Sequence, residues 1–251
     1  MVEKIKEQTE VKVVDELTSR ISRIKEILEK LSCGVINQIV LEKDGIVSVT
    51  DDTRSIFAYC KESVLDFESD IGIYDLKLFL AFLTTAMGYE KILSVEIKDN
   101  RLYLICDGDS YQYLLADSKL ISQRIKEPIN TLNKIKTKEL VSEVDLTNKL
   151  SAITGALGLL TSTDVGYFRV GDGKVLLDIG TDIEHKISLF LASSVSGKAE
   201  WKISTVLLGR ILSSAVGVDK VMLELRKDCP LIFKFAGLYI ALSTAVEKKE
   251  K

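Results

Sequence analysis

The chain has 251 residues, of which 46% are hydrophobic and 28% are charged, and its formal net charge is −3. This length suits one large domain or two of about 100–130 residues each, and the composition suits a protein with a substantial apolar core. The slightly negative charge excludes a uniformly basic nucleic-acid-binding protein, but not one that confines its positive charge to a single surface.

Several classes of protein are disfavoured by what the sequence lacks. No apolar run approaches the roughly 18 residues that a membrane helix needs. Residues 1–10 are too charged for a signal peptide. The chain has a single histidine, His185, which makes histidine-dependent catalysis or metal binding a weak prospect. Four scattered cysteines without a CxxC pair indicate buried, reduced thiols in a cytoplasmic protein; they are Cys33, Cys60, Cys106 and Cys229.

The first half begins with a predicted amphipathic helix. Its apolar residues recur at intervals of three and four, which places them on one helical face; they are Leu17, Ile21, Ile24, Leu28 and Leu31. Short strands are then predicted at Val35–Leu41, Ile46–Thr50, Ile56–Tyr59 and Val64–Phe67, with Lys43-Asp44-Gly45 as a hairpin turn. A second helix is predicted over Tyr74–Met87, followed by strands at Ser94–Lys98, Leu102–Cys106 and Tyr111–Ala116.

A connector, Asp117–Val141, separates the halves. It contains five lysines and no clean periodicity, so it is predicted to cross the surface as a long irregular segment. Connectors of this length are uncommon unless they are functional or disordered. Its scattered apolar residues indicate that it lies against another part of the protein.

The second half repeats the order of the first. The residues Leu146, Leu150, Ile153, Leu157 and Leu160 each follow their counterparts in the first helix by 129 positions. Strands are predicted at Tyr167–Val170, Val175–Ile179 and Ile187–Ala192, with Gly171-Asp172-Gly173 as the matching turn. A helix over Lys202–Val216 aligns with Tyr74–Met87 at an offset of 128, and strands at Leu231–Phe235 and Leu238–Leu242 complete the half.

This repetition predicts a duplicated α+β fold, in which each of two similar domains has two helices packed on antiparallel sheets. A period this long indicates a domain duplication and not a solenoid. The predicted organisation is a charged tail (1–11), a first domain (12–117), the connector (118–140), a second domain (141–246) and a charged C-terminal tail (247–251).

The pattern resembles the processivity clamps of the proliferating-cell-nuclear-antigen type. The local likeness is strongest to the sliding clamps of tailed phages, through Val64-Leu65-Asp66-Phe67, Ile71–Leu76 and Phe79-Leu80. Pro230-Leu231-Ile232 and Tyr239–Leu242 are similar to the last hairpin of the wider family. The resemblance implies a homotrimeric ring in the cytoplasm, or the host cytoplasm for a viral protein. The ring encircles double-stranded DNA without sequence preference and tethers a DNA polymerase after a clamp loader places it. The resemblance implies no cofactor, no metal and no membrane partner.

A ring of this kind implies helices that face DNA. The basic residues expected on these faces are Arg20, Arg23, Lys30, Lys91, Lys149, Lys202, Arg210 and Lys220. Acidic neighbours of the first helix, such as Glu26 and Glu29, offset much of this charge, so the lining is expected to be weakly basic. The alternative is that these residues belong to ordinary solvated faces.

The resemblance also implies a partner pocket and subunit contacts. The pocket for a partner peptide is expected where the connector passes the second domain, and it comprises Ile121, Ile125, Ile129, Leu132, Pro230, Leu231, Tyr239 and Ala241. The alternative is that these side chains only hold the connector down. The subunit contact would join the strand 110–116 to the strand 185–191 of a neighbour, through Tyr111, Tyr113, Leu115, His185, Ile187 and Leu189.

No catalytic constellation is predicted. Gly171-Asp172-Gly173-Lys174 lacks the second half of a phosphate-loop motif and lies between strands. The protein is therefore expected not to be an enzyme. Two alternatives to the ring stay open: a monomeric or dimeric polymerase processivity factor, and a duplicated structural or scaffold protein without DNA binding.

Overall fold

The structure is a computed structural model that describes residues 2–88, 91–125, 127–180, 185–193 and 197–244, with side chains from residue 16 onward. It divides into two compact units. The first comprises Met1–Ser32, Ile36–Val47 and Lys61–Arg124, and the second comprises Cys33–Val35, Ser48–Cys60 and Ile125–Lys251. In the described part of the chain, no helix is both long and apolar enough to span a membrane.

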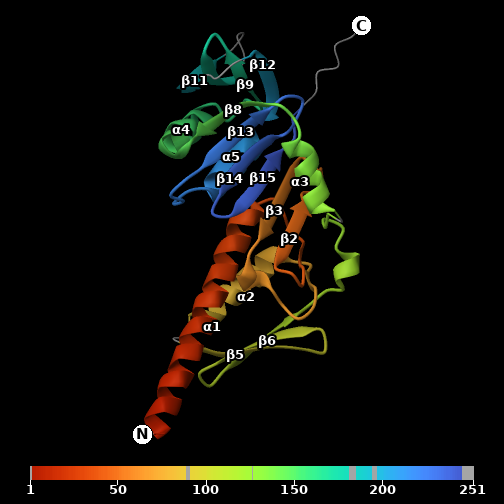
Figure 1. Ribbon diagram of the computed structural model, residues 1–251, viewed down its shortest axis with the longest axis vertical. Coiled ribbons are helices and arrows are strands. Elements are labelled where there is room, and N and C mark those ends of the chain that lie inside the picture. Colours follow the sequence, from red (N-terminus) through yellow and green to blue (C-terminus); the bar gives the residue numbers. More distant parts are fainter. Residues whose placement is uncertain (1, 89–90, 126, 181–184, 194–196, 245–251) are drawn as a thin grey trace. The chain divides into compact units, whose positions relative to one another are not determined.

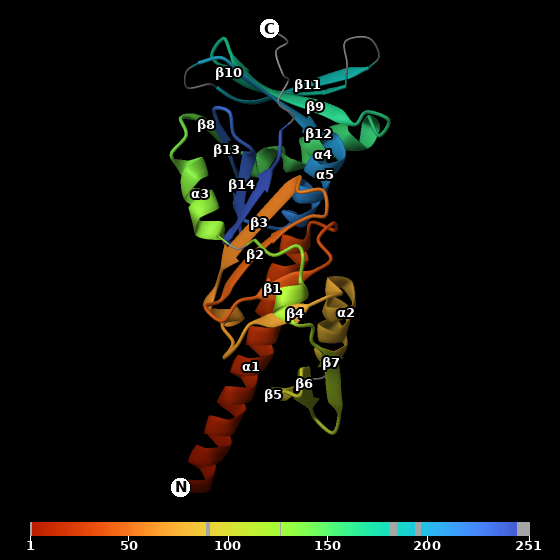
Figure 2. The same ribbon diagram turned by 90° about the vertical axis from the view of Figure 1, so that its right-hand side faces the viewer.

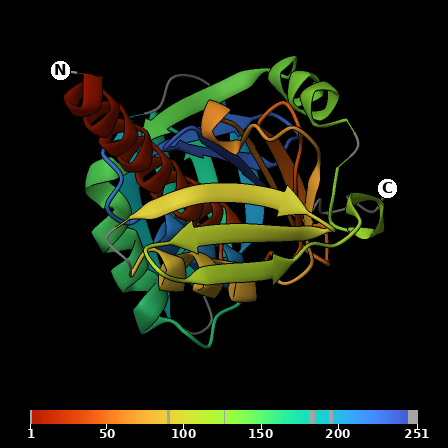
Figure 3. The ribbon, with the colours of Figure 1, turned by 90° about the horizontal axis from the view of Figure 1, so that it is seen from below.

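The first unit holds two helices and two small groups of strands. Helices α1 and α2 lie on one face of the antiparallel sheet β5-β6-β7 (Figure 3). The remaining strands pair in the order β4-β1-β2. The elements are α1 (Val2–Ser32), β1 (Ile39–Leu41), the start of β2 (Ile46–Thr50), η1 (Ser63–Leu65), β4 (Ile71–Ile73), α2 (Leu76–Ala86), β5 (Ile92–Lys98), β6 (Arg101–Cys106), β7 (Ser110–Leu114) and η2 (Ser118–Leu120).

Helix α2 is fixed by its cap and by aromatic packing. The Asp75 side chain accepts a hydrogen bond from the backbone N–H of Leu78 at 2.8 Å, which satisfies one of the free donors at the helix start. The hydroxyl of Tyr113 donates to the Asp75 carbonyl at 3.0 Å, and its ring meets Phe79 edge-on with centroids 4.9 Å apart. Burial of the Phe79 side chain contributes about 1.5–3 kcal/mol to the stability of the folded unit.

The second unit has two sheets. Its larger sheet runs β2-β3-β15-β14-β13-β8, and its smaller sheet runs β11-β10-β9-β12. Connector helix α3 lies on one face of the larger sheet, and α4 and α5 lie side by side on the other (Figure 1, Figure 2). The elements are β3 (Ile56–Lys61), α3 (Pro128–Lys136), β8 (Leu140–Asp145), η3 (Thr147–Lys149), α4 (Leu150–Leu159), β9 (Val165–Gly171), β10 (Lys174–Gly180), β11 (Lys186–Ser193), β12 (Ala199–Ser204), α5 (Thr205–Ser214), β13 (Met222–Arg226), β14 (Leu231–Phe235) and β15 (Leu238–Leu242).

The predicted α+β duplication is confirmed, and the hairpins repeat residue for residue. In β6–β7, Leu104 pairs with Tyr111, and in β14–β15 Phe233 pairs with Ile240, 129 positions later in both strands. The buried positions of the second helices also agree at 129: Leu76, Phe79, Leu83 and Ala86 match Thr205, Leu208, Leu212 and Ala215. The predicted offset of 128 for this helix was therefore wrong by one residue.

The offset of 128 does hold for the strand that follows the second helix, and a β-bulge explains why. Val95 of β5 pairs with Leu104, and Leu223 of β13 pairs with Phe233 in the same way. Strand β13 therefore follows β5 by 128 positions, one fewer than the 129 that separate the two helices. The pairing of β5 slips between Ile92 and Ser94, which absorbs one extra residue in the first copy. The bulge therefore accounts for the step from 129 to 128, and one extra residue in the β13–β14 turn, relative to the β5–β6 turn, restores 129 in the next strand.

Other differences from the sequence prediction concern short elements. The predicted strand Val64–Phe67 is a single 3₁₀ turn, and the predicted irregular connector contains α3. Helix α1 begins at Val2, inside the segment predicted to be a tail. The compact units also differ from the predicted domains, because β3 pairs along its length with β15 and the β2–β3 hairpin therefore belongs to the second unit.

Candidate nucleic-acid interface and partner surface

The basic residues of α1 are held by groups of their own unit. Arg20 donates from Nε to the Val64 carbonyl at 3.0 Å and from Nη2 to the Asp66 carbonyl at 2.5 Å. Its guanidinium also lies 5.0 Å from the centroid of the Phe67 ring. Arg20 therefore anchors the η1 segment against α1, a structural role that its predicted position on a DNA-facing surface did not reveal.

The other predicted basic residues of α1 form ion pairs. Arg23 contacts Glu26 at 2.8 Å and Glu62 at 3.6 Å, and Lys30 lies 3.9 Å from Glu26. Such partly exposed pairs contribute only about 0.2–1 kcal/mol each to stability. Their larger effect is on the surface potential, because each pair cancels a charge that would otherwise attract phosphate. The weakly basic character expected of this helix is thus built into its side-chain contacts.

Helix α2 presents more apolar than basic surface. Tyr74, just before the helix, is 65% exposed and Leu78 is 58% exposed, whereas Lys77 is the one basic residue in its sequence. Lys91 follows the helix and is exposed. The first unit therefore offers little concentrated positive charge on its helices.

The helices of the second unit have a different character. Helix α4 contains no charged residue, and α5 contains only Arg210, which is exposed. A groove of about 390 Å³ lies between these helices, and Arg210 is its charged residue. The other lining residues carry hydroxyls, are glycines or are aliphatic: Thr154, Leu157, Gly158, Leu160, Thr161, Thr163, Thr205, Val206, Gly209 and Ser213. A Cβ added at Gly155 or Gly158 would meet nothing within 4 Å, so the α4 backbone is open to close approach.

The remaining predicted basic residues of this unit lie at three separate places. Lys149 is half-buried in η3, and Lys202 is half-buried in β12, where it lines a second hollow beside the start of α5. Lys220 is exposed near Asp145. Hydrogen bonds from Thr147 lower the pKa of Asp145, and the charge of Lys220 adds to this effect. Among the described basic residues of this unit, Arg210 alone lines the α4–α5 groove.

The predicted partner surface centres on Tyr239, on the face of the larger sheet that α3 covers. The ammonium groups of Lys136 and Lys234 lie 5.4 Å and 5.8 Å from the centroid of the Tyr239 ring. The ring of Tyr59 meets it edge-on at 6.3 Å. Cations at this distance from an aromatic ring are attracted by its quadrupole. The tyrosine is thus held in place, half-buried, between two lysines.

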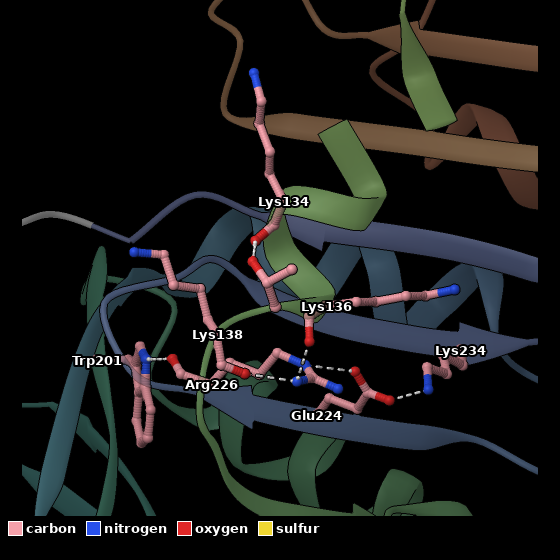
Figure 4. A network of polar contacts seen from close by, with 8 residues as sticks. Lys134, Lys136, Lys138, Trp201, Glu224, Arg226 and Lys234 are labelled. Carbon is pink, nitrogen blue, oxygen red and sulfur yellow. Dashed lines mark hydrogen bonds and ion pairs between the residues drawn. The ribbon is translucent and has the colours of Figure 1, made fainter. Parts of the chain in front are cut away.

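A buried ion network ties α3 to this sheet (Figure 4). Arg226 donates from Nη1 to the carbonyls of Lys136 at 3.1 Å and Lys138 at 2.8 Å, which satisfies free acceptors at the helix end. Its Nε donates to Glu224 at 3.1 Å, and Lys234 donates to the other oxygen of Glu224. Burial opposes ionisation of Glu224, but the hydrogen bonds and charges of Lys234 and Arg226 outweigh it and lower its pKa.

The sequence did not single out Glu224 or Arg226, although one signal was available. They occupy alternate positions in an otherwise apolar strand, so both point to the same face of the sheet. Charged residues there require partners, since an unpaired buried charge is costly.

The structure divides the predicted pocket residues into surface and core. Ile129 is 50% exposed, and Ile125, Pro230 and Tyr239 are half-buried. Leu132 and Ala241 are buried beneath them, and Ile121 is buried in the first unit. Leu231 is wrong as a pocket residue, because it is fully buried and alternates with Ile232, so it faces away from Tyr239. A cluster of Ile135, Cys229 and Ile232 supports the half-buried Tyr239 ring.

The two strands predicted to join subunits are both edge strands. Among the described strands, β7 is outermost in its sheet and β11 is outermost in its own. Tyr111, Leu115, Ile187 and Leu189 are half-buried, and His185 is exposed just before β11. Tyr113 is wrong as a contact residue, because it is buried against α2.

Sequence reasoning missed the most exposed apolar side chains of these strands. Leu114 of β7 is 65% exposed and Phe190 of β11 is 49% exposed. An open strand edge with exposed apolar side chains favours pairing with another chain. Alternation alone did not indicate which residues of these strands face outward.

Among the described residues, no group of three or more histidine, cysteine, aspartate or glutamate side chains is arranged to hold a metal ion. The four cysteines all lie in the described part of the chain, where they are buried thiols that form no disulfide, as predicted. Burial raises the pKa of Cys33 to about 11, although a contact with the Ser214 hydroxyl opposes the shift.

No protein-family model and no curated protein sequence matches the chain. Solved structures do match, at low identity. PCNA from A. fulgidus, solved with the C-terminal region of FEN-1, has a TM-score of 0.64 at 16% identity, and the match covers 90% of this chain and 97% of that one. The PCNA2–PCNA3 complex from Sulfolobus tokodaii scores 0.65 at 16% identity, covering 89% and 96%, and PCNA from Entamoeba histolytica scores 0.65 at 15%, covering 90% and 96%. The chain therefore has the fold of a PCNA-type sliding clamp over nearly its whole length.

Proposed function

We propose that the chain is one subunit of a DNA sliding clamp, which encircles duplex DNA and tethers a replicative DNA polymerase. The observation that carries this proposal is the match of the whole duplicated fold to PCNA, at TM-scores of 0.64–0.65 over about nine-tenths of the chain. Tethering works by raising the effective concentration of the polymerase at the primer end and needs no chemistry of its own.

The proposed ring is a homotrimer closed by head-to-tail pairing of β7 with β11 of the next subunit. Both strands are sheet edges, and each exposes a large apolar side chain, Leu114 or Phe190. A heterologous contact of this kind closes into a ring when its rotation suits a small integer, and closure leaves no edge open to aggregation. One neighbouring structure is itself a complex of two PCNA subunits.

The proposed DNA contact is sparse and unevenly distributed. On α1, Arg20, Arg23 and Lys30 are engaged by carbonyls and carboxylates of their own unit, whereas Arg210 stands beside an uncharged helix. Few simultaneous phosphate contacts suit a ring that must slide, since sliding requires weak, sequence-independent attraction. A monomeric processivity factor would need a more strongly basic face, which favours the ring over that alternative.

The partners of the proposed clamp are double-stranded DNA, a DNA polymerase and a clamp loader. The A. fulgidus neighbour was solved with a segment of FEN-1, a partner bound through its terminal region. We propose that this chain also takes partner segments, at the surface around Tyr239 and α3. The likeness to tailed-phage clamps stays a prediction from Val64–Phe67 and Ile71–Leu76.

Size-exclusion chromatography with light scattering tests the proposed ring. The expected mass is three times the 27.9 kDa of the chain. A mass of 27.9 kDa at micromolar concentrations would overturn the ring and leave the monomeric processivity factor and the scaffold protein.

A further inference from the structure

Lysines are concentrated around the end of α3, in a chain whose net charge is −3. Four lysines there are exposed and one is half-buried; they are Lys134, Lys136, Lys138, Lys227 and Lys234. Exposed carboxylates also lie there: Glu127 at the start of α3, Glu139, Asp228, and Glu143, which pairs opposite Glu224 in β8. Glu224 itself is buried and paired with Arg226 and Lys234. The positive charge is concentrated beside the Tyr239 ring, where the ammonium groups of Lys136 and Lys234 both lie.

One edge of α3 combines charge with apolar surface. Ile129, Asn133 and Lys136 are spaced at i, i+4 and i+7, so they share a side of the helix. The ammonium group of Lys136 lies over the Tyr239 ring. Ile129 is seven residues before Lys136, which places it about 10 Å from Lys136 along the helix axis at about 1.5 Å per residue. Because Ile129 is 50% exposed, the edge offers an apolar contact at one end and ammonium groups at the other.

This edge, formed by Ile129, Lys136, Lys234 and Tyr239, is held in place before any partner arrives. Arg226 fixes the end of α3 through two carbonyls, and Leu132 and Ile135 bury its inner side. A surface that is already ordered loses less entropy on binding than a mobile loop. Its charge and shape can therefore select among partner segments.

We propose that this edge binds an acidic segment of a partner protein. One apolar side chain of the segment contacts Ile129, a second contacts the Tyr239 ring, and flanking carboxylates lie against Lys136 and Lys234. The inference rests on the proposed clamp function, and it specifies the chemistry of the segment through which a partner is tethered. Charge complementarity of this kind sets specificity and association rate more than total affinity.

Labelled peptides that differ only in their flanks test the proposal. Each carries the same leucine–phenylalanine anchor, flanked by aspartate and glutamate, by serine, or by lysine, and binding to the full chain is followed by fluorescence anisotropy. The acidic peptide is expected to bind most tightly and the lysine peptide most weakly. Lys136→Glu is expected to weaken the acidic peptide by about tenfold and to reverse the order of the flanks.

Lys134→Glu is the matched control. It makes the same change of charge in the same helix, but the side chain of Lys134 points away from Lys136 and Lys234 (Figure 4). It is expected to change binding of the acidic peptide by less than about threefold, because solvent and salt screen a charge that does not contact the peptide. If the two substitutions weaken binding equally, the attraction is a general electrostatic one, and the proposed binding at the edge formed by Ile129, Lys136, Lys234 and Tyr239 is refuted.

Two other results would overturn the proposal: equal binding of the acidic and lysine peptides, or no detectable binding of any of them. Failure of the proposed clamp function has a separate readout, since retention of the chain on DNA does not involve this edge. Lys136→Glu is expected to leave the trimeric mass unchanged. If the chain binds the acidic peptide but is monomeric, the proposed peptide-binding edge is supported and the proposed ring is refuted.

Discussion

Glu224 accepts a hydrogen bond from Nε of Arg226 at 3.1 Å, two residues along the same strand, although its side chain is almost fully buried. The same arginine binds the carbonyls that end α3, and the same carboxylate binds Lys234 beside Tyr239. This pair therefore couples the stability of the second unit to the position of the connector helix.

Removing the charge of Glu224 is expected to destabilise the protein. Glu224→Gln should lower the free energy of unfolding by about 1.5–3 kcal/mol at neutral pH, the range for hydrogen bonds to charged groups. Folding lowers the pKa of Glu224, so its ionised form stabilises the protein fully above the ordinary pKa of 4.5. This stabilisation is lost as the pH falls from 4.5 through the lowered pKa of the folded protein. Urea unfolding of both proteins at neutral and acidic pH should show the difference shrinking in acid; a constant difference would refute the ionic role.

The two arginines that were both predicted to face DNA should behave differently. Arg210→Ala is expected to reduce the dependence of log K on log salt by about 0.9, the loss of one phosphate contact, with little change in stability. Arg20→Ala should leave that slope unchanged and destabilise the first unit, because the carbonyls of Val64 and Asp66 lose their donor. DNA-binding titrations over a salt series, paired with thermal unfolding, separate the two, and a smaller slope for Arg20→Ala would contradict the assignment.

The exposed apolar residues of the edge strands should govern self-association. Leu114→Lys or Phe190→Lys is expected to shift the protein from trimer to monomer, since a charge on either edge opposes strand pairing. Leu120→Lys provides the control, because Leu120 is 75% exposed but lies outside both strands. Light scattering measures the masses; a trimer that survives both edge substitutions would place the contact elsewhere.

Cys33 should report global unfolding. With a pKa of about 11, only about one thiol in a thousand is ionised at pH 8, and the side chain is buried. Alkylation at this residue, followed by peptide mass spectrometry, should therefore be slow in the native protein and accelerate across the urea transition. Fast labelling without denaturant would show that the end of α1 opens locally.

The repeat could be predicted from the sequence because amphipathic helices and half-buried strands place apolar residues at regular spacings. Ile24 and Ile153 are buried in their respective helices, as their shared spacing indicated. The offset of the second helix was predicted as 128 and is 129, because the pattern of apolar residues does not reveal the bulge between Ile92 and Ser94.

The site was less predictable, because its contacts join residues distant in sequence. Arg20 stands on the flank where a DNA-facing residue is expected, but its acceptors lie 44 and 46 residues away. Connector helix α3 has nine residues and buries only three of them, too few for a clear periodicity. Strand β7 is so short that alternation could not decide whether Tyr113 or Leu114 faces outward.

Encirclement of DNA is tested most directly by threading without a loader. The protein is incubated with linear duplex DNA whose ends are free, the ends are then blocked by a bulky protein, and the complex is washed in high salt. A ring is expected to stay on the blocked DNA, to be released when the DNA is cut, and not to be retained when the ends are blocked first. Retention that is independent of the ends, or complete loss in high salt, would contradict a ring around DNA.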